Sequence, residues 1–195
     1  MQKFKPILFS TPMVQAILEG RKTMTRRIAN NFIQEYALKN DNVSPENIGT
    51  TVFKKPINIG DILWVRETFR ERKQMTGWPY GYKATAMVDG DPVDEKWKPS
   101  LFMPKAACRI FLEVTNVRLE RLQDISEKDA IAEGVICEKI DVIHKWKDYS
   151  RQGYLPSAKF SFFSLWEKIN GKESVSQNPW VWVYEFKQIE KPENF

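Results

Sequence analysis

Polar and apolar residues alternate most regularly between residues 107 and 122, in the stretch ACRIFLEVTNVRLERL. Cys108, Ile110, Leu112 and Val114 fall on one side of an extended chain, and the residues between them fall on the other. This alternation predicts a half-buried strand, which we expect to be the longest in the sheet. Shorter runs of strand-forming residues predict further strands at residues 6–10, 62–65, 80–88 and 179–186.

Other segments carry the start and stop signals of helices. Residues 10–20 place Pro12 in the first turn and a glycine just after the last turn. Residues 126–134 begin with a capping box at Ser126 and also end on a glycine. Residues 160–171 carry a stripe of aromatic and aliphatic side chains at helical spacing. We therefore expect about three helices.

The order of these elements indicates the fold class. Strands that follow one another directly outnumber strands that are separated by helices, which predicts an α+β fold with a mostly antiparallel sheet, for which a closed barrel is one solution. Residues 29–56 and 89–106 have the composition of polar loops, and residues 138–157 show no clear period. Because the sequence contains no internal repeat and no linker-like stretch, we expect one domain over residues 1–195.

Composition narrows the classes of function. The 195 residues suffice for one ordinary domain, and 30 Lys and Arg against 25 Asp and Glu give a net charge of +5. This mild excess favours polyanionic partners without requiring them. One histidine, His144, and two cysteines, Cys108 and Cys137, argue against a disulfide framework, most zinc sites and a His-based triad. We expect both thiols to lie in or near the core and His144 to lie in a surface loop.

The chain shows no signal for export or membrane insertion. Its N-terminal stretch MQKFKPILFSTP has too short an apolar run for a signal peptide, and no stretch approaches the length of a membrane span. A cytoplasmic location is therefore expected.

The segment GRKTMTRR, residues 20–27, groups four cationic side chains around two threonines. It follows the C-terminus of the first predicted helix, whose partial negative charge favours nearby cations. In an extended chain Lys22 and Arg26 point to one side, and Thr25 and Arg27 point to the other. The cluster is either a solvated basic rim or the setting of a lysine whose pKa is lowered by burial and by neighbouring arginines for use in chemistry.

The order of four motifs resembles the ASCH domain, a branch of the PUA-like β-barrel superfamily: ILEGRKTMTRR, GDILWVRETF, LQDISEKDAIAEGV and a final aromatic strand. The stretch WKPSLFMPKAACRI and the tryptophan-rich C-terminal strand are similar to a phage- and prophage-type group of ASCH proteins. The resemblance implies a mostly antiparallel PUA-like β-barrel with about three flanking helices and two loop insertions, near residues 29–56 and 70–106.

The resemblance also implies a catalytic set, because the ASCH family includes an amidohydrolase that removes the acetyl group of N(4)-acetylcytidine with a Lys, a Thr and a Glu. These residues correspond to Lys22, Thr25 and Glu133. Thr25 would be the nucleophile, Lys22 its base and proton donor, and Glu133 the group that orients the lysine or shuttles the proton. Because a nearby carboxylate raises the pKa of a lysine, Glu133 is the alternative proton acceptor. No metal or cofactor is implied.

Other residues of the same motifs are expected to contact the substrate: Arg21, Arg26, Arg27, Trp64, Arg66 and Glu67. Arginine suits a phosphate or a base edge, and an aromatic side chain suits stacking on a base. Trp78 and Trp97 lie in the second insertion and are candidates for a lid. Trp180 and Trp182 share one face of the last strand, where packing is the simpler explanation.

Three functions remain open at this point. The first is a metal-independent amidohydrolase that acts on N-acylated pyrimidine nucleosides or related modified bases. The second is a module of PUA-like type that binds RNA or a modified base, or a ribonuclease. The third is a phage accessory protein that acts through protein contacts. An enzyme requires Lys22, Thr25 and Glu133 to converge on one pocket, whereas a nucleic-acid reader requires a basic groove and salt-sensitive binding.

Overall fold

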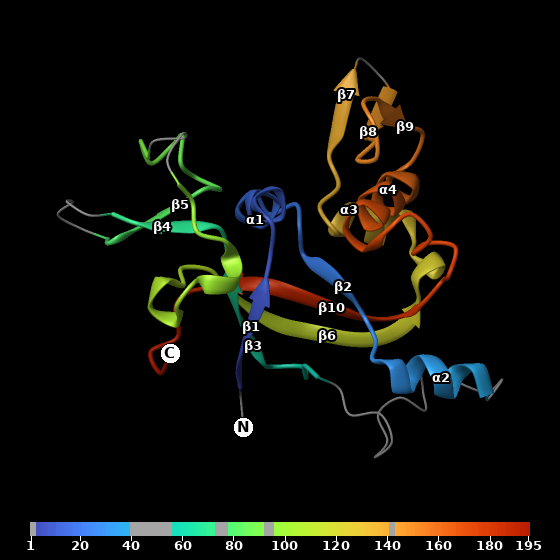
Figure 1. Cartoon of the computed structure of the whole chain (residues 1–195), viewed down its shortest axis with the longest axis horizontal. Coiled ribbons are helices and arrows are strands. Elements are labelled where there is room, and N and C mark those ends of the chain that lie inside the picture. The colour runs from blue at the N-terminus through green and yellow to red at the C-terminus, as the bar shows by residue number, and fades with distance from the viewer. Residues whose placement is uncertain (1–2, 40–55, 73–77, 92–95, 141–142) are drawn as a thin grey trace. The chain divides into compact units, whose positions relative to one another are not determined.

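The computed structural model describes residues 3–39, 56–72, 78–91, 96–140 and 143–195. The chain forms two compact units, each built from segments that are far apart in the sequence (Figure 1). The first unit contains residues 1–20, 59–115 and 186–195, and the second contains residues 21–58 and 116–185. Strands β6 (Phe111–Arg121) and β10 (Trp180–Ile189) contribute residues to both units.

The sheet of the first unit begins with a parallel pair. Strand β1 (Phe4–Leu8) lies beside β3 (Ile62–Arg66), with Ile7 opposite Val65. The order then continues to β6, which is antiparallel to β3, and to β10. Helix α1 (Thr11–Leu18) follows β1 and has a proline in its first turn, as the sequence predicts.

A two-stranded hairpin of β4 (Phe69–Glu71) and β5 (Tyr80–Tyr82) also belongs to the first unit (Figure 1). The predicted strand at residues 80–88 ends at Tyr82 because the next residues form turns, in which the Val88 N–H donates to the Thr85 carbonyl. The predicted loop that follows contains two short 3₁₀ helices, η2 (Ser100–Phe102) and η3 (Lys105–Ala107). The core of this unit gathers aromatic and aliphatic side chains from all these segments: Ile62, Phe69, Tyr82, Met103, Ala107, Cys108 and Phe111.

The second unit pairs β2 (Met24–Ile28) with β10 in antiparallel register, so that Thr25 lies opposite Tyr184. Strand β10 in turn neighbours β6. Helix α2 (Asn31–Lys39) follows β2 directly. The sequence analysis missed this helix because its segment is polar and lies inside the expected insertion at residues 29–56, of which residues 40–55 lie outside the described part of the chain.

Helices α3 (Glu127–Ala132) and α4 (Ala158–Asn170) pack against each other in the second unit (Figure 1). Helix α3 begins where the sequence predicts, because the Ser126 hydroxyl accepts a hydrogen bond from the Asp129 N–H. Both helices bury apolar side chains against strand residues in a single core: Met24, Leu122, Ile125, Ala130, Val135, Ala158, Phe162, Trp166, Val181 and Val183.

A small antiparallel sheet covers part of the segment in which the sequence shows no period. Strands β7 (Cys137–Ile140), β8 (Ile143–Lys147) and β9 (Tyr154–Leu155) pair in this order, and α4 contacts β8 and β9. Two expectations are wrong here. Cys137 is exposed rather than near the core, and the exposed His144 lies on β8 rather than in a loop. Cys108 is buried, as expected.

The α+β class is confirmed, and the main sheet is mixed, because β1 pairs with β3 in parallel whereas β3–β6 and β2–β10 are antiparallel. The described residues contain four α-helices where about three are expected. Gly134 and Gly171 follow the ends of α3 and α4 with φ of 86° and 101°, which explains why glycine marks both stops. The predicted closed barrel is not confirmed: among the described residues the strands follow the order β1-β3-β6-β10-β2, with β1 and β2 as unpaired edges. In the described part of the chain, every helix is too short or too polar to cross a membrane.

Candidate functional site

Lys22 lies two residues before β2 and forms an isolated β-bridge with Glu133, the residue that caps the C-terminus of α3. Residues 21–23 supply hydrogen-bond donors to three consecutive carbonyl groups at this helix end. The Thr23 N–H donates to Ala132, the Lys22 amine to Glu133, and the Arg21 guanidinium to Gly134. The cations of GRKT therefore satisfy the C-terminal carbonyls of α3, a partner that the sequence did not identify.

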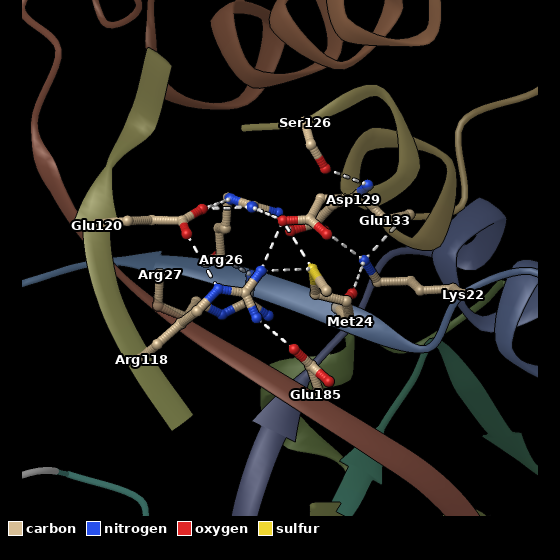
Figure 2. Close-up of polar contacts among 10 residues, drawn as sticks. All are labelled: Lys22, Met24, Arg26, Arg27, Arg118, Glu120, Ser126, Asp129, Glu133 and Glu185. Atoms are coloured by element: carbon tan, nitrogen blue, oxygen red, sulfur yellow. Dashed lines mark hydrogen bonds and ion pairs between the residues drawn. The ribbon is translucent and has the colours of Figure 1, made fainter. Parts of the chain in front are cut away.

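The Lys22 amine is fully enclosed, with a side-chain exposure of 0%. Its Nζ donates to the Met24 carbonyl at 2.8 Å, to the Glu133 carbonyl at 2.9 Å and to the Glu133 carboxylate Oε2 at 2.7 Å (Figure 2). Three acceptors around one nitrogen match the three N–H bonds of an ammonium group. The arrangement therefore holds Lys22 in its protonated form.

Burial lowers the pKa of Lys22, because an ammonium group in a low-dielectric interior loses its hydration. The Glu133 carboxylate opposes this effect through its charge and its hydrogen bond, and Arg27 and Arg26 lower the pKa slightly further. Lys22 thus carries a proton that it gives up more readily than a lysine in water. This is the electrostatic state that suits a proton donor.

Arg26 binds the other oxygen of the same carboxylate. Its guanidinium donates to Glu133 Oε1 at 3.2 Å, and it also binds Glu120 and Asp129 (Figure 2). The Arg26 side chain has 0% exposure, so its charge is neutralised within the protein. Arg26 therefore fixes Glu133 from the side opposite Lys22, and it has no donor directed towards solvent.

The ion-pair network extends to residues that the sequence analysis did not single out. Arg118 binds Glu120, Asp129 and Glu185, and it is only partly buried. The network is visible in Figure 2 between β2, β6 and α3. Arg118 and Glu120 alternate with the buried Val117 and Leu119 on β6, a pattern that could have revealed the pair.

Thr25 is buried, but it is not an acceptor of the Lys22 amine, whose three hydrogens all go to other groups. It lies opposite Tyr184 on β10, and by strand alternation it shares a face with Arg27 rather than with Lys22 and Arg26. Burial raises the pKa of Tyr184 and lowers that of Arg27. The structure thus brings Lys22 and Glu133 together, and it joins Thr25 to a different set of neighbours.

The remaining expected substrate contacts have partners of their own. Arg21 is exposed and binds the carbonyl at the end of α3. Trp64, Arg66 and Glu67 belong to the first unit, where the Arg66 guanidinium lies 5.6 Å from the centre of the Trp64 ring and donates to the Leu101 carbonyl. Glu67 is buried and binds Arg109.

The chemistry that this network permits is proton donation and electrostatic stabilisation. All three hydrogens of the Lys22 ammonium group are donated to acceptors, so its nitrogen has no free lone pair in this arrangement. The two oxygens of Glu133 each accept a hydrogen bond, one from Lys22 and the other from Arg26. Within the described residues, no cluster of three or more His, Cys, Asp or Glu side chains is arranged to hold a metal ion.

Known proteins that resemble this chain are few and distant. No family model and no curated protein matches the sequence. One similar solved structure is the ASCH domain from Lactobacillus crispatus JV V101, with 14% identity and a TM-score of 0.40, covering 97% of this chain and 81% of that chain. Another is a protein of Enterococcus faecalis V583 described as family DUF984, with 10% identity, a TM-score of 0.43, and coverage of 99% and 84%. Similarity at this level assigns neither a fold nor an activity to the chain.

Proposed function

We propose that the chain is a metal-independent amidohydrolase of the ASCH type, a PUA-like domain, that acts on N-acylated pyrimidine nucleosides or related modified bases. The observation that supports the proposal is the contact between Lys22 and Glu133, which are 111 residues apart in sequence and meet at 2.7 Å in a fully buried site. The motif resemblance names the same two residues for this chemistry.

The geometry favours one division of roles over the alternative. Glu133 accepts the proton of the nucleophile, and the Lys22 ammonium donates a proton to the leaving amine. The lowered pKa of Lys22 helps the second step. Thr25 attacks the acyl carbon, and water then hydrolyses the resulting ester to release the acid. This sequence requires the Thr25 hydroxyl to come within hydrogen-bond reach of Glu133 when substrate is bound.

The direct test is incubation of the purified protein with N(4)-acetylcytidine and longer N(4)-acyl analogues, with cytidine release followed by chromatography. We expect Lys22→Met, Glu133→Gln and Thr25→Val each to lower kcat/KM by about 100-fold or more. Thr23→Val is the matched control, because Thr23 is an exposed threonine of the same motif and should retain wild-type activity. Thermal unfolding of each variant separates loss of activity from loss of structure.

Two outcomes would contradict the proposal. Absence of turnover with every analogue would remove the hydrolase activity as a whole. Full activity in a folded Thr25→Val variant would remove Thr25 as the nucleophile, and water activated by Glu133 would then be the attacking group.

A second candidate is recognition of RNA or of a modified base without a chemical step, or with the phosphodiester cleavage of a ribonuclease. The saturation of the Lys22 amine weighs against a chemical step there, since three satisfied donors at 0% exposure are also typical of a structural ion pair. The wild-type protein can be titrated with acylated nucleosides and with RNA. Binding of either ligand without turnover would support this candidate.

A further inference from the structure

The first unit contains a pocket of about 500 Å³ that is lined by aromatic and cationic side chains. It does not include Lys22, Thr25 or Glu133. The residues that carry the argument are Arg72, Trp78, Tyr80, Tyr82, Arg109 and Lys191. Among them only Trp78 is a candidate from the sequence, as part of a lid, because the others come together through the β4–β5 hairpin, the segment before β6 and the segment after β10.

Arg109 is held rigidly at the pocket. Its guanidinium makes two hydrogen bonds to the Glu67 carboxylate, at 2.9 and 3.1 Å, and a third to the Thr85 hydroxyl. The same guanidinium lies 3.8 Å from the centre of the Tyr82 ring. Glu67 is 1% exposed, so this pair is anchored in the interior. Arg109 therefore presents a fixed planar cation to a ligand without having to change its conformation on binding.

Arg72 is held in a similar way by Asp91. Two hydrogen bonds of 3.0 and 2.6 Å join them, and Arg70 binds the same carboxylate at 2.9 Å. Asp91 packs directly on Gly81 of β5, where an added Cβ would lie 2.6 Å from Asp91 Oδ2. Glycine at this position lets the carboxylate approach the strand, and the carboxylate in turn orders the arginine beside the pocket.

The aromatic side chains form the apolar part of the lining. Trp78 and Tyr80 pack edge to face, with ring centres 5.9 Å apart. The Trp78 indole donates to the Tyr82 hydroxyl at 2.7 Å, and that hydroxyl donates to the Ala107 carbonyl at 2.6 Å. Trp78 nevertheless remains 46% exposed, which is a large exposure for an indole that is fixed by a hydrogen bond. Its ring is thus ordered and accessible to a ligand.

The ionisation states of the lining groups at pH 7 determine whether the pocket attracts an anion or a cation. Burial raises the pKa of the Cys108 thiol to about 11 and that of the Tyr82 phenol to about 12, so both groups are neutral at pH 7. Lys191 is exposed and makes no hydrogen bond or ion pair with another described residue. Asp89 is the acidic residue of the lining, set against Arg72, Arg109 and Lys191.

We infer that this pocket binds a planar heteroaromatic ring that carries an anionic group, such as a nucleoside monophosphate or the end of a nucleic-acid strand. The ring would stack on Trp78 and on the plane of Arg109, and the anion would pair with Lys191. A cage for a methylated ammonium also uses aromatic walls, but here Arg72 and Arg109 are each paired with a carboxylate, and the ammonium group of Lys191 would repel such a ligand. This inference does not depend on the proposed hydrolase function.

The test is titration of the full chain with nucleoside monophosphates, monitored by calorimetry and by tryptophan fluorescence. Matched arms use the nucleosides, inorganic phosphate, choline and a short single-stranded RNA with a 5′-phosphate. We expect the monophosphates to bind, the nucleosides to bind about tenfold more weakly, and phosphate and choline not to bind measurably. Comparison of the monophosphate with the RNA end distinguishes a free nucleotide from a strand terminus as the ligand.

Variants locate the binding site. Trp78→Leu should weaken binding about tenfold or more by removing the stacking surface, and Lys191→Ala should lower affinity for monophosphates but not for nucleosides. Phe160→Ala, which removes an exposed aromatic side chain of α4, is the matched control and should bind normally. The inference is overturned if no monophosphate binds, if choline binds better, or if folded Trp78→Leu and Lys191→Ala proteins bind as well as wild type. Because Lys22 lies outside the pocket lining, Lys22→Met should keep nucleotide binding even if it abolishes hydrolysis.

Discussion

Two lysine–glutamate pairs in this chain have the same N–O distance and opposite environments. Lys22 and Glu133 meet at 2.7 Å with exposures of 0% and 5%, whereas Lys98 and Glu71 meet at 2.7 Å with exposures of 51% and 60%. Removing one partner of a buried pair leaves an uncompensated charge in the interior, while an exposed partner is simply hydrated. The distance alone therefore says little about what each pair contributes.

We predict that Lys22→Met lowers the free energy of unfolding by about 3 kcal/mol, because Glu133 then keeps Arg26 as a partner but loses an ammonium in a dry site. Lys98→Met should change it by less than about 0.5 kcal/mol. Urea denaturation of both variants measures the difference. Equal losses in the two variants would mean that burial does not decide the strength of these pairs.

Asp91 gives stability that depends on pH. The hydrogen bonds from Arg72 hold the pKa of Asp91 below its ordinary value of 3.8. At a pH between the pKa of Asp91 in the folded chain and 3.8, the unfolded chain binds a proton at this residue and the folded chain does not. The stability that Asp91 contributes is therefore fully present above pH 3.8, and it is lost as the pH falls through the pKa of the folded chain. The difference in unfolding free energy between wild type and Asp91→Asn should therefore shrink as the pH is lowered.

Urea denaturation from about pH 6 to about pH 2.5 measures this difference. Arg72→Met provides the control, since in that background Asp91→Asn should show a much weaker pH dependence. A difference that stays constant across the range in the wild-type background would contradict the assignment.

For single residues, the sequence predicts which side chains belong to the candidate site but not how they are arranged. Lys22 and Glu133 could be named because their motifs resemble those of a known family. Their closed geometry could not be foreseen, since the acceptors of the Lys22 amine include two backbone carbonyls whose positions depend on how α3 ends beside residues 21–23. Cys137 was misplaced for a similar reason. Two apolar residues precede it, yet the exposure of its thiol on β7 depends on tertiary packing.

At the scale of elements, α3 connects local sequence to the candidate site. Its N-cap is Ser126, and its C-cap is Glu133, so the helix sets where that carboxylate lies. A six-residue helix has few internal hydrogen bonds, and its termini therefore contribute a large share of its stability.

We predict that Ser126→Ala lowers the free energy of unfolding by about 1 kcal/mol, because the N–H of Asp129 loses its acceptor. Ser126→Asp should retain most of the stability, since aspartate is also a good N-cap and its charge is favourable at a helix N-terminus. Thermal or urea unfolding of both variants measures the effect. Similar losses for alanine and aspartate would show that the hydroxyl acts through some contact other than the cap.

Elements with strong local signals were predictable, and the others were not. Helices α3 and α4 have serine N-caps, α1 has a proline in its first turn, and all three are followed by a glycine, signals that act within a few residues; β6 has regular alternation. Strands β7, β8 and β9 show no period in the sequence, and where the structure describes the burial of their side chains these are exposed or half-buried, so no buried face selects apolar residues there at every second position. Helix α2 does carry apolar residues at helical spacing, with Ile33 buried and the ring centres of Phe32 and Tyr36 6.2 Å apart. It lies inside the expected insertion at residues 29–56, whose polar composition as a whole predicts a loop.

At the scale of the whole molecule, the count of 30 Lys and Arg overstates the number of cations available to a polyanion. Many arginines of both units already bind carboxylates: Arg26, Arg70, Arg72, Arg109 and Arg118. At about one Debye length in physiological salt, the charge of such an arginine is cancelled by that of its carboxylate partner, so the pair attracts a phosphate only weakly. A groove that follows many phosphates requires cations without such partners.

We therefore predict that a single-stranded RNA of about ten nucleotides binds with a shallow salt dependence, in which log Kd changes with log salt by no more than about 1.4, the value for about two phosphates. Raising salt from about 50 mM to about 200 mM should then weaken binding by about sevenfold. Fluorescence anisotropy at several salt concentrations measures the slope, with a nucleoside monophosphate as the single-phosphate reference. About six phosphate contacts would instead weaken binding by about 300-fold over the same range, and that result would mean that an extended basic track, rather than one aromatic pocket, receives the nucleic acid.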